Sequence, residues 1–324
     1  THKSVELAKL QIDCGAKGIT CATLTELEVM AKAGIDDILL AIPLIGDDQW
    51  NRLSSILQRY PITFTTIVDS EVGMNGLAKV GEWINEPINV LVAVDGGLHR
   101  EGIQAQETVA FVKRLLSNKW LRFKGIFTYF GHIYGLSPDE QEKIAKEEAT
   151  FLIEQKQKLE REGIKVDVLS GGSSVSSHYP EQLAGITESR AGNYIFYDMN
   201  AVRQHIARIE ECALRIVAKV ISMPMKGKAT IDAGSKALTS DLPIKGDGYG
   251  FVVNQPELKI VKLNEEHGYV EYDPDKVDVQ IGDVIEIIPN HSCVVPNLFH
   301  EVFLFEDEKL IGSIPIDARG RNYV

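Results

Sequence analysis

Residues 88–102 read INVLVAVDGGLHREG, a short aliphatic run that ends in two glycines and a group of charged side chains. A run that is almost continuously apolar is typical of a parallel strand buried on both faces. The same pattern recurs in the first two-thirds of the chain, at residues 18–23, 37–42, 62–68, 123–129, 166–169 and 186–190. The sequence therefore predicts an α/β protein built on a parallel sheet.

Longer amphipathic stretches separate these runs, and the clearest covers residues 138–162. It begins with Ser137 as a cap and Pro138 at the first helical position, and Gly163 ends it. Repeating βα units form either a doubly wound sheet or a (β/α)8 barrel. Because the chain starts within a first helix at residues 4–13, we expect a TIM-like barrel whose first strand precedes Thr1.

The pattern changes after Cys212, where Gly, Pro and alternating apolar residues become frequent. Regularly spaced short strands of this kind predict an all-β domain. The expected strands are residues 213–221, 230–232, 250–253, 259–263, 268–272, 283–288 and 301–305. We therefore expect a barrel over residues 1–211 and a smaller β-domain over residues 212–324.

Composition limits the classes of function. The chain has 34 Lys and Arg residues against 46 Asp and Glu residues, a net charge of −12. An acidic chain without a basic block argues against nucleic-acid or anionic-membrane partners. No apolar run approaches the ~20 residues of a membrane helix, and no leader pattern follows Thr1. The four cysteines form no CxxC pair, which suits a reducing compartment. We expect a cytoplasmic protein that binds a small molecule.

Polar residues follow several of the expected barrel strands, where barrel enzymes place their chemistry. Asp95 and Arg100 follow residues 88–94, although a glycine-rich turn with a surface arginine would look the same. Tyr129 and His132 follow the next strand, and a histidine at such a place is more often structural than catalytic.

Residues 170–177, SGGSSVSS, follow the strand at 166–169. Glycines followed by hydroxyl residues form a group of N–H and O–H donors that suits a phosphate. A loop with a helix cap is the alternative. Arg190, Gly192 and the residues after them add a cation and further amides. Without a Walker-type lysine, a phosphorylated cofactor or sugar phosphate is favoured over ATP.

The β-domain contains PNHSCVVPN at residues 289–297. In a strand, His291 and Cys293 would point to the same side, and imidazole with thiolate suits Zn²⁺. Two ligands are too few for a structural site, so a third ligand would come from elsewhere and positions would stay open. A buried cysteine beside a satisfied histidine is the alternative. Residues 265–267, EEH, could supply a donor or form a solvated turn.

Together, residues 94–102, residues 190–194 and the barrel-then-β order resemble the fold-type III pyridoxal-phosphate enzymes, such as alanine racemase. Residues 1–3, residues 265–268 and residues 289–293 resemble the D-serine dehydratase and D-threonine aldolase branch of that class. The likeness covers essentially the whole chain, and the His-x-Cys motif is its most specific part.

The resemblance implies a role for each candidate residue. It places the Schiff-base lysine immediately before Thr1, with His132 and Tyr129 as catalytic helpers, and it implies that His291 and Cys293 bind zinc. Arg100 would contact the phenolic oxygen of the cofactor, and Arg190 falls where alanine racemase has the arginine that faces the pyridine nitrogen. The residues expected at the cofactor are Arg100, Ser170, Gly171, Gly172, Ser173, Arg190, Gly192, Asn193 and Tyr194.

The resemblance also implies a reaction. Ala93 stands where alanine racemase has a lysine, and residues 231–236 replace its tyrosine-containing loop, so racemisation is disfavoured. A pyridoxal-phosphate- and zinc-dependent lyase of D-3-hydroxy amino acids is implied instead. His-x-Cys favours elimination to a keto acid and ammonia, as in D-serine dehydratase. Cleavage to glycine and an aldehyde, as in D-threonine aldolase, is the alternative.

Two alternative functions are not those of a lyase. A non-catalytic pyridoxal-phosphate-binding protein is a remote alternative, because such proteins are single barrels without a β-domain. A barrel acting on a sugar phosphate is disfavoured by the combined motifs. By analogy with the fold type, we expect a homodimer.

Overall fold

The computed structural model describes residues 1–320 and divides into two compact units. One unit, called here the parallel unit, comprises residues 4–133 and 139–191. The other, called the antiparallel unit, comprises residues 1–3, 134–138 and 192–320. The last four residues of the expected β-domain, 321–324, lie outside the described residues.

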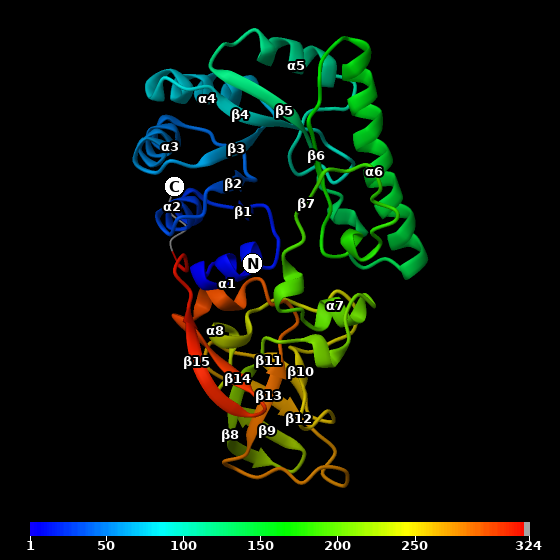
Figure 1. The fold of residues 1–324 in the computed structure, drawn as a ribbon. Coiled ribbons are helices and arrows are strands. Elements are labelled where there is room, and N and C mark those ends of the chain that lie inside the picture. Colours follow the sequence, from blue (N-terminus) through cyan, green and yellow to red (C-terminus); the bar gives the residue numbers. More distant parts are fainter. Residues whose placement is uncertain (321–324) are drawn as a thin grey trace. The chain divides into compact units, whose positions relative to one another are not determined.

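The parallel unit contains a seven-stranded parallel sheet whose strands pair in sequence order (Figure 1). Its strands are β1 (Ile19–Cys21), β2 (Asp37–Leu40), β3 (Thr63–Val68), β4 (Ile88–Ala93), β5 (Leu121–Phe127), β6 (Val168–Gly171) and β7 (Glu188–Ser189). Its helices are α1 (Val5–Asp13), α2 (Leu24–Lys32), α3 (Asp47–Arg59), α4 (Glu71–Ile84), α5 (Thr108–Leu116) and α6 (Pro138–Arg161). Each of the seven expected strands overlaps one of these, so the TIM-like barrel fold is confirmed.

Burial on both faces explains the continuous apolar runs. Leu39, Ile67, Leu91 and Phe127 come from neighbouring strands and form one buried cluster. The alternate strand residues join a larger cluster with the helices, in which Ile38 is fully buried. Because both faces of each strand are covered, hydrophobic residues are needed at nearly every position.

The antiparallel unit is built on a six-stranded sheet in the order β10-β13-β8-β9-β12-β11 (Figure 1). The strands are β8 (Ile216–Met225), β9 (Lys228–Ile231), β10 (Phe251–Val252), β11 (Lys259–Leu263), β12 (Gly268–Glu271) and β13 (Val284–Ile288). A separate hairpin pairs β14 (Glu301–Glu306) with β15 (Lys309–Pro315). The expected all-β character is confirmed, and β15 is an additional strand.

The antiparallel unit begins earlier in the chain than the expected domain range 212–324. Residues 192–211, which include α7 (Met199–Arg203), group with the β-strands. The backbone N–H groups of Met199 and Asn200 donate to the carbonyl oxygens of Pro289 and Asn290, both at 3.0 Å. These bonds tie α7 to the segment that follows β13, and the boundary at residues 211 and 212 stays a prediction.

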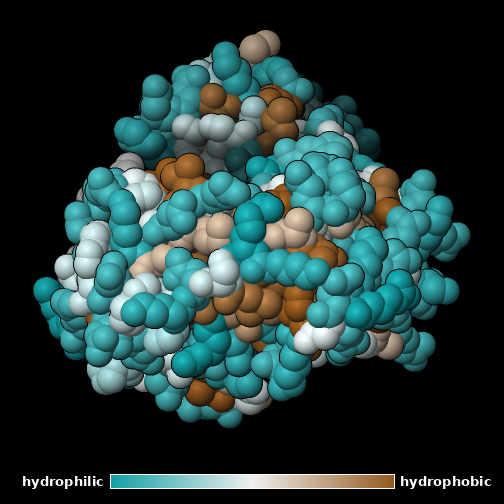
Figure 2. Space-filling view, turned by 90° about the horizontal axis from the view of Figure 1, so that it is seen from above, coloured by the Kyte–Doolittle hydropathy of each residue, from teal (hydrophilic) through white to brown (hydrophobic). Residues whose placement is uncertain are grey.

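The surface is mainly hydrophilic on the face drawn in Figure 2, where hydrophobic side chains occupy smaller areas between the hydrophilic ones. Within residues 1–320, no helix combines the length and apolar character needed to cross a bilayer.

Candidate functional site

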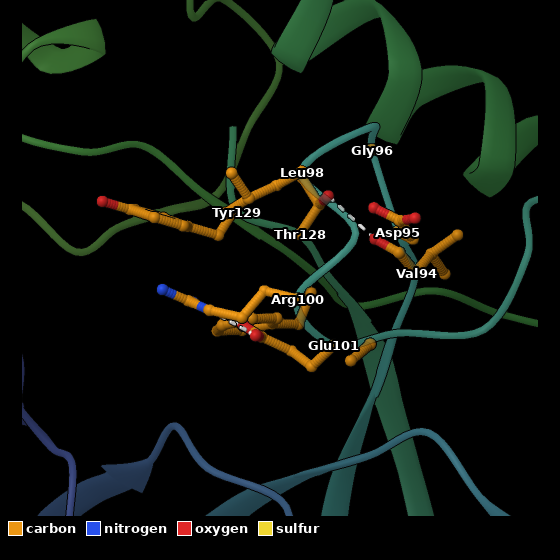
Figure 3. A pocket seen from close by; sticks show the side chains of 10 residues that line it. Val94, Asp95, Gly96, Leu98, Arg100, Glu101, Thr128 and Tyr129 are labelled. Carbon is orange, nitrogen blue, oxygen red and sulfur yellow. Dashed lines mark hydrogen bonds and ion pairs between the residues drawn. The ribbon is translucent and has the colours of Figure 1, made fainter. Parts of the chain in front are cut away.

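The loop after β4 and the end of β5 enclose a small hollow (Figure 3). The guanidinium carbon of Arg100 lies 4.7 Å from the centroid of the Tyr129 ring, within cation–π distance. Glu101 pairs with the Nε and Nη2 atoms of the same guanidinium. The structure thus brings Arg100 and Tyr129 together at the carboxyl ends of two adjacent strands.

His132 lies on a short 3-10 turn (Gly131–Ile133) after β5. Its ring packs against Phe130, with the ring centroids 5.0 Å apart. Within the described residues its Nδ1 atom is buried and has no hydrogen-bond partner. A purely structural histidine is normally satisfied in the interior, so this unpaired nitrogen favours a functional role.

The Ser/Gly loop after β6 forms a compact cluster of hydroxyl groups. Gly172 has φ +81°, and a Cβ there would lie 2.6 Å from Ser189 Oγ, so only glycine fits. The Ser177 and Ser189 hydroxyls are 2.7 Å apart and flank this glycine. The backbone N–H of Gly172 is held by the Glu148 carboxylate at 2.9 Å. The Ser177 and Ser189 hydroxyls are donors of the type that binds a phosphate, but here they bond each other and the Gly172 N–H bonds Glu148, so a phosphate role for this loop stays a prediction.

Ser173 and Ser176 stabilise this loop by reciprocal hydrogen bonds. The Ser173 backbone N–H donates to Ser176 Oγ at 2.7 Å, and the Ser176 backbone N–H donates to Ser173 Oγ at 3.1 Å. These bonds fix the backbone that carries Gly171 and Gly172. The sequence left a helix cap and a phosphate loop as alternatives; the Ser173 and Ser176 bonds are those of a serine-stabilised turn, and the phosphate role stays a prediction.

Arg190 ties two strand ends together. Its Nη1 atom donates to Ser170 Oγ and its Nη2 atom donates to the Thr128 carbonyl oxygen, both at 2.6 Å. Its guanidinium carbon lies 3.9 Å from the centroid of the Phe127 ring. Burial lowers the pKa of Arg190 to about 10, so it stays charged at neutral pH. These contacts are made with protein atoms, and a role for Arg190 toward the cofactor stays a prediction.

In the antiparallel unit, Asn193 joins the residues after β7 to the His-x-Cys segment. Its Nδ2 atom donates to Asp198 Oδ2, and its Oδ1 atom accepts from the Ser292 hydroxyl, each at 2.8 Å. A Cβ on Gly192 would lie 2.8 Å from the Thr1 hydroxyl oxygen. Tyr194 is 44% exposed. Within this unit, the expected phosphate-binding residues and the expected metal ligands are therefore linked.

His291 and Cys293 meet, but not in the expected strand. β13 ends at Ile288, and the two residues lie in the following turn. Their expected position in a strand is therefore wrong, because Ser292 donates its backbone N–H to Asp198 Oδ2 at 2.8 Å instead of continuing a ladder. The turn still brings the imidazole and the thiol into hydrogen-bond contact.

Asp241 is the functional neighbour that the sequence did not reveal. Its Oδ2 atom lies 2.7 Å from His291 Nδ1. A carboxylate on one ring nitrogen fixes the tautomer and orientation of a metal-ligating histidine and leaves Nε2 for the ion. The two residues are 50 positions apart, and no local motif links them.

His291 and Cys293 change each other's pKa, and the imidazole would have to give up a proton on binding a metal ion. Contact with Cys293 raises the pKa of His291 to about 9, against the opposing effect of burial. Burial alone would raise the pKa of the Cys293 thiol, but the hydrogen bond and charge of His291 outweigh it, so this pKa is lowered. A polarised thiol beside an oriented imidazole is a donor set that Zn²⁺ prefers.

A third protein donor is not found. Among residues 1–320, no group of three or more His, Cys, Asp and Glu side chains is arranged to hold an ion. Residues 265–267 belong to the turn between β11 and β12, where Lys236 Nζ lies 2.6 Å from Glu266 Oε1. Catalytic zinc sites keep three protein ligands and one open position, so the third ligand expected from the sequence stays a prediction.

Comparison with known proteins places the chain in a family. The model of the alanine racemase N-terminal domain matches residues 1–200, and the model of a putative serine dehydratase domain matches residues 213–305. D-threo-3-hydroxyaspartate dehydratase of Delftia sp. (strain HT23) is 32% identical over 314 residues, covering 90% of this chain and 82% of that protein. D-serine dehydratase of Dictyostelium discoideum is 29% identical over 343 residues, covering 97% and 87%.

A solved structure shows the same architecture. The Delftia dehydratase superposes with a TM-score of 0.88 at 28% identity, covering 97% of this chain and 88% of that one. Solved variants of that dehydratase include one with a histidine replaced by alanine and one with a cysteine two positions later replaced by alanine, the latter in a metal-free form.

These findings define the class as the fold-type III pyridoxal-phosphate enzymes. Within that class the chain belongs to the D-serine dehydratase and D-threonine aldolase family, and it is a pyridoxal-phosphate-dependent lyase.

Proposed function

We propose that the protein is a dehydratase of D-3-hydroxy amino acids that eliminates the β-hydroxyl to give a keto acid and ammonia. The observation that carries the proposal is the contact between His291 and Cys293, with Asp241 holding the other side of the imidazole. This donor set suits an ion that can act on a hydroxyl group. Similarity to dehydratases of D-serine and D-threo-3-hydroxyaspartate supports the substrate class.

The cofactor, when bound, withdraws electrons from the α-carbon of an amino acid. Arg100 would bind its phenolic oxygen, and the Tyr129 ring lies against the guanidinium. The Ser177 and Ser189 hydroxyls, which bond each other, would be available to its phosphate together with residues 192–194 of the antiparallel unit.

His291 and Cys293 would hold the divalent metal, which would supply Lewis acidity at the β-hydroxyl of the substrate. Asp241 accepts from His291 Nδ1 and so presents Nε2 to the ion. His132, whose buried Nδ1 atom has no hydrogen-bond partner among residues 1–320, would assist proton transfer. A cytoplasmic location and a homodimeric assembly stay predictions.

Aldol cleavage is the second candidate, because 3-hydroxy-D-aspartate aldolase of Paracoccus denitrificans (strain Pd 1222) is 30% identical over 99% of this chain. Product analysis separates the two reactions. Full-length protein is incubated with D-serine, D-threonine and D-threo-3-hydroxyaspartate, with and without a chelator. The proposal requires a keto acid and ammonia, lost on chelation. Glycine and an aldehyde would establish the aldolase instead.

A substitution of Cys293 tests whether this residue binds the metal. Cys293→Ala is expected to lose activity and bound metal together. Cys14→Ala is the matched control, because Cys14 is an exposed free cysteine at the end of α1. If the two variants behave alike, the assignment of Cys293 to the metal is wrong.

A further inference from the structure

The loop that carries Arg100 is closed at its base. The backbone N–H of Asp95 donates to the Ile103 carbonyl oxygen, and the N–H of Ile103 donates to the Ala93 carbonyl oxygen, both at 2.9 Å. The backbone N–H of Gly102 donates to Asp69 Oδ2 at 3.0 Å. The loop of residues 95–102 therefore starts and ends beside the carboxyl end of β4.

The interior of the loop is fixed by one carboxylate. Asp95 Oδ1 accepts the backbone N–H groups of Gly97 and His99 at 2.9 and 3.0 Å. Asp95 Oδ2 lies 2.6 Å from His99 Nδ1, and the Asp95 side chain is only 7% exposed. The backbone position from which the Arg100 side chain departs is thus determined before any ligand binds.

The direction of the guanidinium is determined by its neighbour. Glu101 accepts from both Nε and Nη2 of Arg100, along one edge of the planar group. The Glu101 side chain is 16% exposed, whereas the Arg100 side chain is 57% exposed. Figure 3 shows this pair beneath the Tyr129 ring. A guanidinium held along one edge keeps its remaining Nη1 donors in a fixed direction.

We propose that Glu101 is a positioning residue, which holds Arg100 by one edge so that its free donors meet the phenolic oxygen of the cofactor. The proposal rests on the cofactor role of Arg100 within the proposed function. The effect of Glu101 is on cofactor binding and is independent of which bond of the substrate breaks.

The test compares Glu101→Ala and Glu101→Gln in full-length protein stripped of cofactor and titrated with pyridoxal phosphate. Glu101→Ala is expected to weaken binding by about two- to tenfold, the factor that one net hydrogen bond contributes. Glu101→Gln keeps one acceptor oxygen but places an NH2 group opposite the second arginine N–H, so it is expected to recover part of the affinity and to fall between Glu101→Ala and the unmodified protein. The pH midpoint of the visible band of the bound cofactor should move in Glu101→Ala, because its phenolic oxygen loses a fixed donor.

Two further variants make the result decisive. Glu162→Gln removes an exposed carboxylate that pairs with Lys113 in the same unit, and it should leave affinity and midpoint unchanged. Arg100→Ala should weaken binding at least as much as Glu101→Ala. If Arg100→Ala weakens binding and Glu101→Ala matches the unmodified protein, the positioning role is refuted and the proposed function is untouched. If Arg100→Ala has no effect, the cofactor role of Arg100 fails, and the positioning role fails with it.

Discussion

One carboxylate orients each of two side chains that we expect to bind a ligand, the imidazole of His291 and the guanidinium of Arg100. Asp241 contacts His291 at Nδ1, and Glu101 contacts Arg100 along one edge. Each partner is itself at least partly exposed, so neither contact is required to neutralise a deeply buried charge. The contacts restrict orientation, and orientation is what a ligand-binding imidazole or guanidinium needs.

The role of Asp241 gives a prediction at the residue scale. Asp241→Asn should lower the affinity for Zn²⁺ by about 10- to 100-fold, because outer-shell partners of metal-ligating histidines contribute on that scale. Direct titration of the metal into stripped protein measures the change. Asp232→Asn is the control in the same unit, where Asp232 Oδ1 accepts the backbone N–H of Lys219 at 2.7 Å. Equal affinities in both variants would remove Asp241 from the metal site.

At the scale of the element, close backbone contact holds β5 against β6. Gly125 lies in β5 opposite Val168 of β6, and a Cβ on Gly125 would lie 1.8 Å from the Val168 carbonyl oxygen. Gly125→Ala is expected to destabilise the fold by about 3 kcal/mol, because the backbones must separate. Urea unfolding measures the loss. Gly312→Ala in β15 is the control, since nothing lies within 4 Å of a Cβ there.

The sequence predicts the parallel strands better than it predicts β15. In β4 every residue except Asn89 is apolar and buried, so the run is almost continuously apolar. In β15, Leu310 and Ile311 are about 60% exposed, and no alternation marks a buried face. The pattern of apolar residues in a sequence reveals a strand when one of its faces is buried. In the β14–β15 hairpin, β15 has almost no buried residues, so the pattern is missing.

The candidate site residues were also only partly predictable from the sequence. Arg100, His291 and Cys293 stand in local motifs and were predicted. Asp241 could be identified only from the structure, because it lies 50 positions from its partner His291 in the sequence. Ser177 and Ser189 were similarly separated, and their contact required β6 and β7 to be adjacent. Sequence motifs identify the groups that touch ligands, whereas the groups that orient them are set by tertiary pairing.

At the scale of the whole molecule, the candidate residues are divided between the two compact units. Arg100, Tyr129 and the Gly172 loop belong to the parallel unit, and His291 and Cys293 belong to the antiparallel unit. Gly192, Asn193 and Tyr194 also belong to the antiparallel unit, where Asn193 bonds Ser292 between the two expected metal ligands. Arg100 and Tyr129, in contrast, contact no expected metal ligand, so the part of cofactor binding that they provide should survive removal of the metal.

This separation leads to a prediction for metal removal. Chelation of full-length protein should abolish turnover of D-3-hydroxy amino acids while the visible absorbance of the bound cofactor is retained, because Arg100 and the Ser177–Ser189 hydroxyl pair involve no metal ligand. Readdition of Zn²⁺ should restore turnover in the unmodified protein and fail to do so in Cys293→Ala. Absorbance and metal content are measured on the same sample. Loss of the cofactor band together with the metal would show that the two groups bind as one unit, and the expected survival of cofactor binding without the metal would then be wrong.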